Sequence, residues 1–134
     1  MEAASSNRTV SLTIPAKPDY VVLARLALSA VCRIAPLEIE DAADLKLAVT
    51  EAATYLMGDD RGAEPSADGE GPQLQFSFDL QDDEIVVEVR GAEQPTLSEE
   101  EREMSWAIIG ATVDDSDFEG GTMRLRKRLG LSAE

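Results

Sequence analysis

The sequence predicts a two-layer α/β fold in a single domain, and three observations support this prediction. The chain has 134 residues, which is enough for one compact core and short for two. Some segments alternate apolar and polar residues, as half-buried strands do, and others have the spacing of amphipathic helices. In chain order these segments are strand, helix, helix, hairpin, helix and strand, an order that suits one sheet packed against helices.

The N-terminal part is expected to form a strand over residues 9–14 and a helix over about residues 20–34. Apolar and hydroxyl side chains alternate in the strand, and two prolines follow it. Asp19 precedes the helix, where its carboxylate can cap the first free N–H groups. The apolar residues expected to form the buried face of this helix are Val22, Leu23, Leu26, Ala27, Ala30 and Val31.

A second helix is predicted over residues 41–57, which contain neither glycine nor proline. Glu51 lies at the edge of its apolar stripe, and Tyr55 covers the same flank one turn later. A carboxylate in this position borders core and solvent. It is either an ordinary surface residue or part of a site. The stripe consists of Leu45, Ala48, Val49, Ala52 and Leu56.

The segment 58–73 has no apolar periodicity and is rich in glycine and acidic residues, so we expect a mobile loop inside the domain. A β-hairpin follows, with strands at 74–80 and 85–89 joined by a turn at 81–83. Its buried face is expected to contain Leu74, Phe76, Phe78, Leu80, Ile85, Val87 and Val89.

A third helix is predicted over residues 98–113. Ser98 and Glu101 have the spacing of a capping box, which marks its first turn. Trp106 is expected to pack against the sheet, and support of an interface is the alternative. The other residues expected to face inward are Met104, Ala107, Ile108 and Ala111.

The last strand is predicted over residues 122–129, after a glycine pair, with Met123, Leu125 and Leu129 facing inward. Its basic residues are expected to offset nearby carboxylates. Residues 1–8 and 131–134 are predicted to be tails, so the domain spans about residues 9–130.

Composition excludes several classes of function. There is no histidine, which rules out histidine acid/base catalysis and the common zinc sites. The single cysteine, Cys32, is expected to be a small core residue rather than a nucleophile. A formal charge of −15 argues against nucleic-acid binding and favours a basic protein partner, although acidity also keeps a chain soluble. Without a membrane-spanning run or a signal peptide, we expect a cytoplasmic protein.

Two segments resemble the anti-sigma-factor serine kinases, a bacterial branch of the GHKL (Bergerat) histidine-kinase-like ATPases. Asp44-Leu-Lys-Leu-Ala-Val-Thr-Glu-Ala-Ala-Thr-Tyr55 is similar to the family pattern D-L-K-x-A-V-x-E-A-x-T-N. Ile14-Pro-Ala-Lys-Pro-Asp-Tyr-Val21 is similar to I-P-A-K-P-E-Y-V, which leads into the family's first helix. The resemblance implies a two-layer α/β sandwich over residues 9–129, with a mainly antiparallel mixed sheet and helices on one face.

The resemblance also implies roles for single residues. Glu51 matches the family's general base, and Arg25 matches an arginine that touches the sigma factor and the anti-anti-sigma protein. Tyr55, however, stands where the family has the asparagine that holds Mg²⁺. Gly91 and Glu93 replace the aspartate and the next glycine of the adenine-binding D-x-G-x-G.

The third helix departs from the family in a similar way. The family has a glycine-rich segment there, because backbone N–H groups reach phosphates only where side chains are absent. This chain has glutamates at 99, 100, 101 and 103, which would repel a triphosphate. We therefore expect no bound cofactor and a vestigial Glu51.

Three functions remain open at this point. The first is an anti-sigma factor in a partner-switching system that binds a sigma factor of RNA polymerase, is released by an anti-anti-sigma factor, forms a homodimer and lacks kinase activity. The second is an active serine kinase that uses ATP and Mg²⁺, with the acidic residues around Glu99 replacing the missing asparagine. The third is an adaptor that has lost sigma binding, since surfaces of this kind have no motif that is readable alone.

Overall fold

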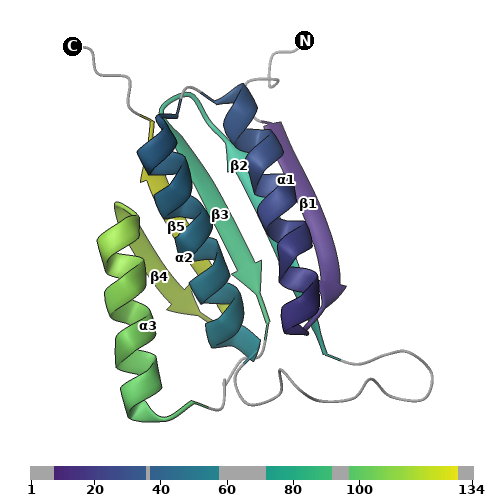
Figure 1. The fold of residues 1–134 in the computed structure, drawn as a ribbon, viewed down its shortest axis with the longest axis vertical. Coiled ribbons are helices and arrows are strands. Elements are labelled where there is room, and N and C mark those ends of the chain that lie inside the picture. Colours follow the sequence, from purple (N-terminus) through teal and green to yellow (C-terminus); the bar gives the residue numbers. More distant parts are fainter. Residues whose placement is uncertain (1–7, 36, 58–71, 92–96, 130–134) are drawn as a thin grey trace.

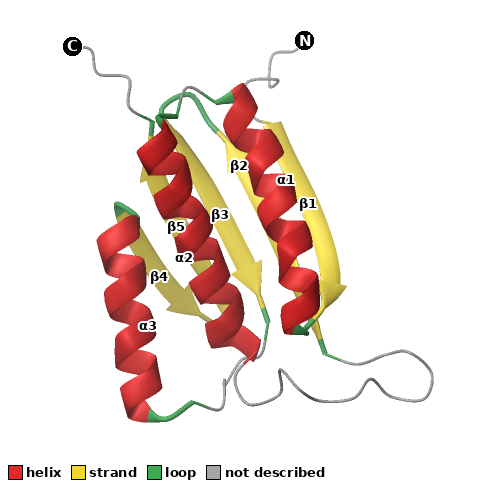
Figure 2. Ribbon diagram, viewed as in Figure 1, coloured by secondary structure: helices red, strands yellow, loops and turns green. Residues whose placement is uncertain are grey.

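The computed structural model places three helices on one face of a five-stranded sheet (Figures 1 and 2). It describes residues 8–35, 37–57, 72–91 and 97–129. Every helix in these ranges is too short or too polar to cross a membrane. The predicted two-layer α/β sandwich with helices on one face is confirmed.

The predicted elements occur in the predicted order, and one strand that was not predicted, β4, lies between the third helix and the last strand. The sheet order is β1-β2-β3-β5-β4, and all four pairings are antiparallel, so these strands do not form the mixed sheet that the resemblance implied. The helices are α1 (Val21–Ile34), α2 (Ile39–Met57) and α3 (Glu99–Thr112). The strands are β1 (Arg8–Pro15), β2 (Gln73–Leu80), β3 (Glu84–Arg90), β4 (Asp115–Glu119) and β5 (Thr122–Arg128).

The core lies between the sheet and the helices, and the strand predictions place it correctly. β2 and β3 alternate as the sequence indicates, and the whole set of seven hairpin residues predicted to be buried is buried. Met123, Leu125 and Leu129 face the same core. Burial of each large apolar side chain contributes about 1.5–3 kcal/mol, so this face supplies most of the stabilisation of the sheet.

The buried face of α1 differs from the predicted one. The buried residues are Val21, Ala24, Leu28 and Val31, whereas Val22, Leu23, Leu26 and Ala30 are exposed and Ala27 is half-buried. Apolar residues surround this helix on nearly all sides, so periodicity alone does not set its rotation. Asp19 does not cap the helix either: a 3-10 turn over Pro18–Tyr20 leads into α1, and Tyr20 at the N-cap makes no side-chain capping bond.

The rotation of α3 is also different. Its capping box is confirmed, because Ser98 Oγ accepts from the Glu101 N–H at 3.1 Å and Glu101 Oε1 accepts from the Ser98 N–H at 3.0 Å. The residues that face inward are Ser105, Ile109 and Thr112. Of those predicted to do so, Ile108 is half-buried, whereas Met104, Ala107 and Ala111 are exposed.

Strand β4 was not predicted from the sequence, because Asp-Ser-Asp-Phe-Glu has low intrinsic strand preference. Tertiary pairing forms it. Asp115 lies opposite Arg126 and Asp117 lies opposite Arg124, and opposite charges across an antiparallel pair are favourable. Gly120 and Gly121 join β4 to β5 with φ of 60° and 81°, a left-handed turn that suits glycine.

Some predictions fall outside the described residues. These are the tail at 1–7, the loop at 58–71, Glu93, and the C-terminal tail at 131–134. Two predicted boundaries are wrong by one residue. Arg8 belongs to β1 rather than to the N-terminal tail, and Gln73 belongs to β2 rather than to the loop before it.

The basic residues of β5 offset nearby carboxylates, as predicted. Arg124 Nε lies 2.9 Å from Glu88 Oε2, and Arg126 Nη1 lies 3.1 Å from Glu84 Oε2, both across the β3–β5 pair. Lys127 faces the core side instead and is 9% exposed. Its ammonium donates to the Thr112 carbonyl at 3.0 Å and lies 3.7 Å from Asp41 and 3.8 Å from Asp44. Lys127 therefore connects β5, the C-terminal end of α3 and the first turns of α2.

We expect Lys127→Met to lower the free energy of unfolding by about 1–2 kcal/mol, because methionine fills the space but leaves the Thr112 carbonyl without its donor. Urea unfolding followed by circular dichroism measures this change. Arg128→Met is the matched control, since the Arg128 side chain is exposed and its loss is expected to change stability by less than about 0.5 kcal/mol. Equal losses in the two variants would contradict the connecting role of Lys127.

Candidate functional site

Glu51 lies half-buried on α2, where α3 packs against it. Ser105 of α3 donates its hydroxyl to Glu51 Oε2 at 2.6 Å. Hydrogen bonds to a carboxylate are short and stronger than neutral ones. The carboxylate predicted as a candidate general base therefore already has a serine hydroxyl as its partner.

Tyr55 is buried, at 4% exposed, rather than covering a solvent-facing flank. Its ring packs edge-on against Trp106 of α3, with centroids 5.9 Å apart, and against Phe118 of β4, at 5.6 Å. Such edge-to-face pairs add about 0.5–1.5 kcal/mol each beyond the burial of their area. Trp106 is half-buried and packs against the core, as predicted, and this aromatic cluster joins α2, α3 and β4.

A hollow of about 450 Å³ opens beside Glu51. Among the described residues, three carboxylates are on its wall, those of Glu51, Glu100 and Glu101, and no basic side chain is. Like charges repel strongly where water is partly excluded, so the hollow disfavours a phosphate chain. The described residues contain no cluster of three or more His, Cys, Asp or Glu side chains suited to a metal ion. The other lining residues are Thr54, Tyr55, Leu97, Met104 and Ser105.

Gly91 follows β3, and its N–H donates to the Gly121 carbonyl at 2.9 Å. A Cβ added there would lie 2.8 Å from Leu56 Cβ and 2.9 Å from Leu74 Cδ2. Real Cβ atoms almost never come so close, so this position has no room for an aspartate unless α2 shifts. The position that the resemblance compares with an adenine-binding aspartate is thus a glycine held by close packing.

Arg25 is exposed on α1 and lies in a different hollow, between α1 and α2. The structure therefore brings Glu51 and Tyr55 together with α3, and it leaves Arg25 on a separate surface. Cys32 is half-buried against the core. Burial raises the pKa of its thiol, with a smaller opposing effect of Lys46, so Cys32 has the character of the core residue that was predicted.

Sequence reasoning did not identify Ser105. Its hydroxyl reaches Glu51 because α3 is rotated from the predicted orientation. In the observed rotation Ser105 is buried at the interface with α2, whereas Met104, which was predicted to face inward, is exposed. A signal was present: Ser105, Ile109 and Thr112 have helical spacing, and two of them are small polar residues of the kind that bond across a tight helix contact.

We expect Ser105→Ala to lower the free energy of unfolding by about 1–3 kcal/mol, because Glu51 loses a charge-assisted hydrogen bond at a half-buried position. Thr54→Ala is the control, since the Thr54 hydroxyl donates to the Thr50 carbonyl of its own helix rather than to α3. A double-mutant cycle with Glu51→Ala measures the coupling directly, and strictly additive losses would show that the two side chains do not interact.

Gly91→Ala should destabilise the protein by about 1–3 kcal/mol, because the new methyl group overlaps Leu56 and Leu74. Gly110→Ala provides the opposite control. Nothing lies within 4 Å of a Cβ at Gly110, and alanine is favoured over glycine inside a helix by about 0.8–1.0 kcal/mol. Thermal unfolding of the two variants is expected to shift the midpoint in opposite directions, and a neutral Gly91→Ala would refute the close approach.

Comparison with known proteins gives one family and several relatives. The model of the histidine kinase-like ATPase domain matches residues 14–127. The serine-protein kinase RsbW of Bacillus pumilus is 39% identical over 90 residues, which cover 63% of this chain and 54% of the relative. The anti-sigma-F factor RsbW of Mycobacterium tuberculosis is 32% identical over 108 residues, which cover 81% and 60%. The chain thus spans just over half the length of these curated relatives.

A solved structure has the same fold. The crystal structure of the RsbU and RsbW domains of a Mycobacterium tuberculosis protein superimposes with a TM-score of 0.66 and 18% identity. The match covers 91% of this chain and 32% of that one. With most of its length matched by the domain model, the chain belongs to the histidine kinase-like ATPase family.

Proposed function

We propose that this protein is an anti-sigma factor that binds a sigma subunit of RNA polymerase without transferring phosphate. Membership of the family and relatives named as anti-sigma-F factor and serine-protein kinase support the first part. One observation supports the second: α3 is closed on α2, with Ser105 bonded to Glu51 and Tyr55 buried against Trp106. In this arrangement Glu51 is vestigial as a base.

The electrostatics of the hollow support the same proposal. A nucleotide would bring its phosphates toward Glu51, Glu100 and Glu101, and the position of an adenine-binding aspartate is filled by Gly91 in close packing. Each of these features weakens nucleotide binding by a different physical route, namely charge repulsion and the lack of a carboxylate to accept a hydrogen bond from adenine. The acidic surface of the chain complements a sigma factor whose DNA-binding faces are basic.

We also propose that an anti-anti-sigma factor releases the bound sigma factor, that this protein forms a homodimer, and that it is located in the cytoplasm. The exposed apolar residues Leu23 and Leu26 of α1 and Val10 of the edge strand β1 provide a surface that a second copy would cover.

Arg25 is proposed as a contact to the sigma factor, since it is exposed and lies on the helix that follows the family-like segment 14–21.

One observation favours a second function, a serine-protein kinase. The Ser105 hydroxyl donates to Glu51, which is the contact that a substrate serine makes with a general base before proton transfer. If α3 swung away, a substrate hydroxyl would replace that of Ser105. This alternative needs Mg²⁺ to be held by carboxylates near Glu99 in place of an asparagine.

The proposal predicts that the purified protein binds a sigma factor without nucleotide and does not bind Mg-ATP. A tagged pull-down identifies the sigma factor, and calorimetric titration of the two purified proteins measures Kd. Arg25→Glu should weaken this complex about tenfold or more by placing a carboxylate at the contact. Arg33→Glu, also exposed on α1, serves as the control for the charge change.

Calorimetric titration with Mg-ATP decides between the two functions. Micromolar binding of Mg-ATP would contradict the proposal that Glu51 is vestigial, and transfer of labelled phosphate to a serine of an anti-anti-sigma protein would establish the kinase. Failure to bind any sigma factor would remove the anti-sigma function itself.

A further inference from the structure

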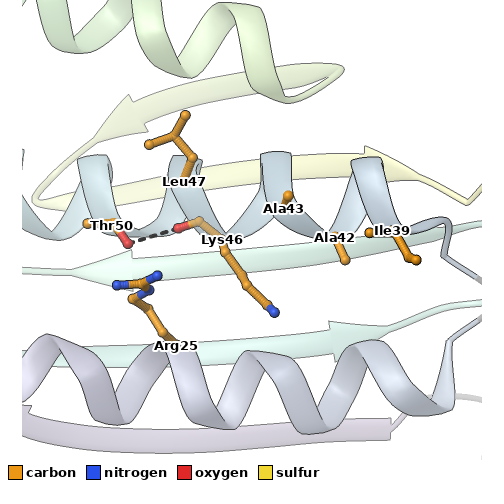
Figure 3. A pocket seen from close by; sticks show the side chains of 7 residues that line it. All are labelled: Arg25, Ile39, Ala42, Ala43, Lys46, Leu47 and Thr50. Carbon is orange, nitrogen blue, oxygen red and sulfur yellow. Dashed lines mark hydrogen bonds between the residues drawn. The ribbon is translucent and has the colours of Figure 1, made fainter.

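A groove of about 460 Å³ runs between α1 and α2 (Figure 3). It shares no lining residue with the hollow beside Glu51. α1 contributes Arg25 to it, and α2 contributes the rest of the lining, from its first three turns. We call it the α1–α2 groove. The lining residues on α2 are Ile39, Ala42, Ala43, Lys46, Leu47 and Thr50.

The apolar part of the α1–α2 groove is unusually exposed. Ile39 is 89% exposed and Leu47 is 49% exposed, although both are large aliphatic side chains. Exposed apolar residues that adjoin one hollow mark an interaction surface more often than scattered ones do. Covering such area contributes roughly 25 cal/mol per Å², so an apolar occupant would gain free energy here.

The spacing on α2 suits a helix as the occupant. Ile39, Ala43 and Leu47 repeat every four residues, and so do Ala42, Lys46 and Thr50. Rows of this spacing form ridges on a helix surface, and the side chains of a second helix pack between them. The two rows extend over about two turns, or roughly 12 Å, so a helix of two or three turns is long enough to cover them.

Two cations give the groove its charge. Arg25 points from α1 toward α2, and Lys46 extends from α2 toward α1 (Figure 3). Within the ranges that the structure describes, no ion pair joins either side chain to a carboxylate. The charge of Lys46 acts across the gap, since it lowers the pKa of Cys32 on α1 against the larger opposite effect of burial. In a chain with a net charge of −15, this is a local positive site.

The remaining polar group of the groove is already engaged. The Thr50 hydroxyl donates to the Lys46 carbonyl at 2.9 Å, which the dashed line in Figure 3 marks. Recognition of charge therefore depends on Arg25 and Lys46. Two separated cations beside alanine, isoleucine and leucine suit a surface with both carboxylates and apolar side chains, and such a surface is one face of an acidic amphipathic helix.

We propose that the α1–α2 groove binds an acidic amphipathic helix of the sigma factor, with its apolar side chains on Ile39, Ala43 and Leu47 and its carboxylates at Arg25 and Lys46. This inference rests on the proposed function and extends it. It adds the N-terminal half of α2 to the contact surface and specifies the chemistry of the partner segment. Basic faces of the same partner remain free to meet the acidic surface elsewhere.

The test measures the affinity of the sigma factor for two groove variants by calorimetry without nucleotide. Lys46→Glu should weaken binding about tenfold or more, because it repels the carboxylates of the partner helix. Ile39→Ser should weaken it about threefold to tenfold through lost apolar contact. Ile39 is almost fully exposed, so its replacement leaves the core intact, and thermal unfolding of each variant verifies the fold.

Matched controls lie on α3. Arg102→Glu makes the same change of charge at an exposed position, and Met104→Ser removes an apolar side chain that is 65% exposed. Both are expected to bind the sigma factor within about twofold of the original protein. A charge-reversing Glu→Lys or Asp→Lys change in the partner helix should restore binding to the Lys46→Glu variant. If Lys46→Glu had simply unfolded the protein, no change in the partner would restore binding.

The outcomes separate the two proposals. If the original protein binds a sigma factor and the groove variants bind it equally well, the groove proposal is wrong while the anti-sigma function stands. The same conclusion follows if the α3 controls weaken binding as much as the groove variants do. If no sigma factor binds the original protein, the anti-sigma function fails, and the groove proposal fails with it.

Discussion

Burial of the α2 stripe against the sheet is the contact on which the rest of the structure depends. Leu45, Ala48, Val49 and Ala52 are fully buried, and α2 lies between α1 and α3 over the centre of the sheet. Small residues alternate with large ones along this stripe, so the helix comes close to the strands and leaves little space. That closeness is also why Gly91 at the end of β3 has no room for a side chain, since Leu56 of α2 lies directly above it.

The position of α3 follows from α2 and decides the character of the candidate site. The aromatic cluster of Tyr55, Trp106 and Phe118 fills the space between α2, α3 and β4, and Ser105 satisfies the Glu51 carboxylate. Lys127 holds the far end of α3 through the Thr112 carbonyl. Tyr55, which the family resemblance compares with a metal-binding asparagine, therefore has a structural role, because its ring is part of the packing that keeps α3 against α2.

Charge is distributed unevenly over the molecule, and this distribution separates two surfaces. Carboxylates surround the hollow beside Glu51, whereas Arg25 and Lys46 lie at the groove between α1 and α2. On the face of the sheet away from the helices, basic residues of β5 pair with Glu84 and Glu88. The pairs on the sheet neutralise one another, whereas within the described residues no ion pair engages Arg25 or Lys46 at the groove.

Local patterning by itself determined the class of fold, the existence of all three helices, the hairpin and its buried face, the capping box at Ser98, and the place of Glu51 at the edge of the α2 stripe. These features depend on periodicity and short-range capping, which neighbouring residues specify. The rotations of α1 and α3, the strand β4, and the contacts of Glu51 with Ser105 and of Tyr55 with Trp106 were decided by tertiary structure. A helix that is apolar on most sides, such as α1, and a short acidic strand, such as β4, have no strong preference of their own, so packing and pairing with distant residues set their final positions.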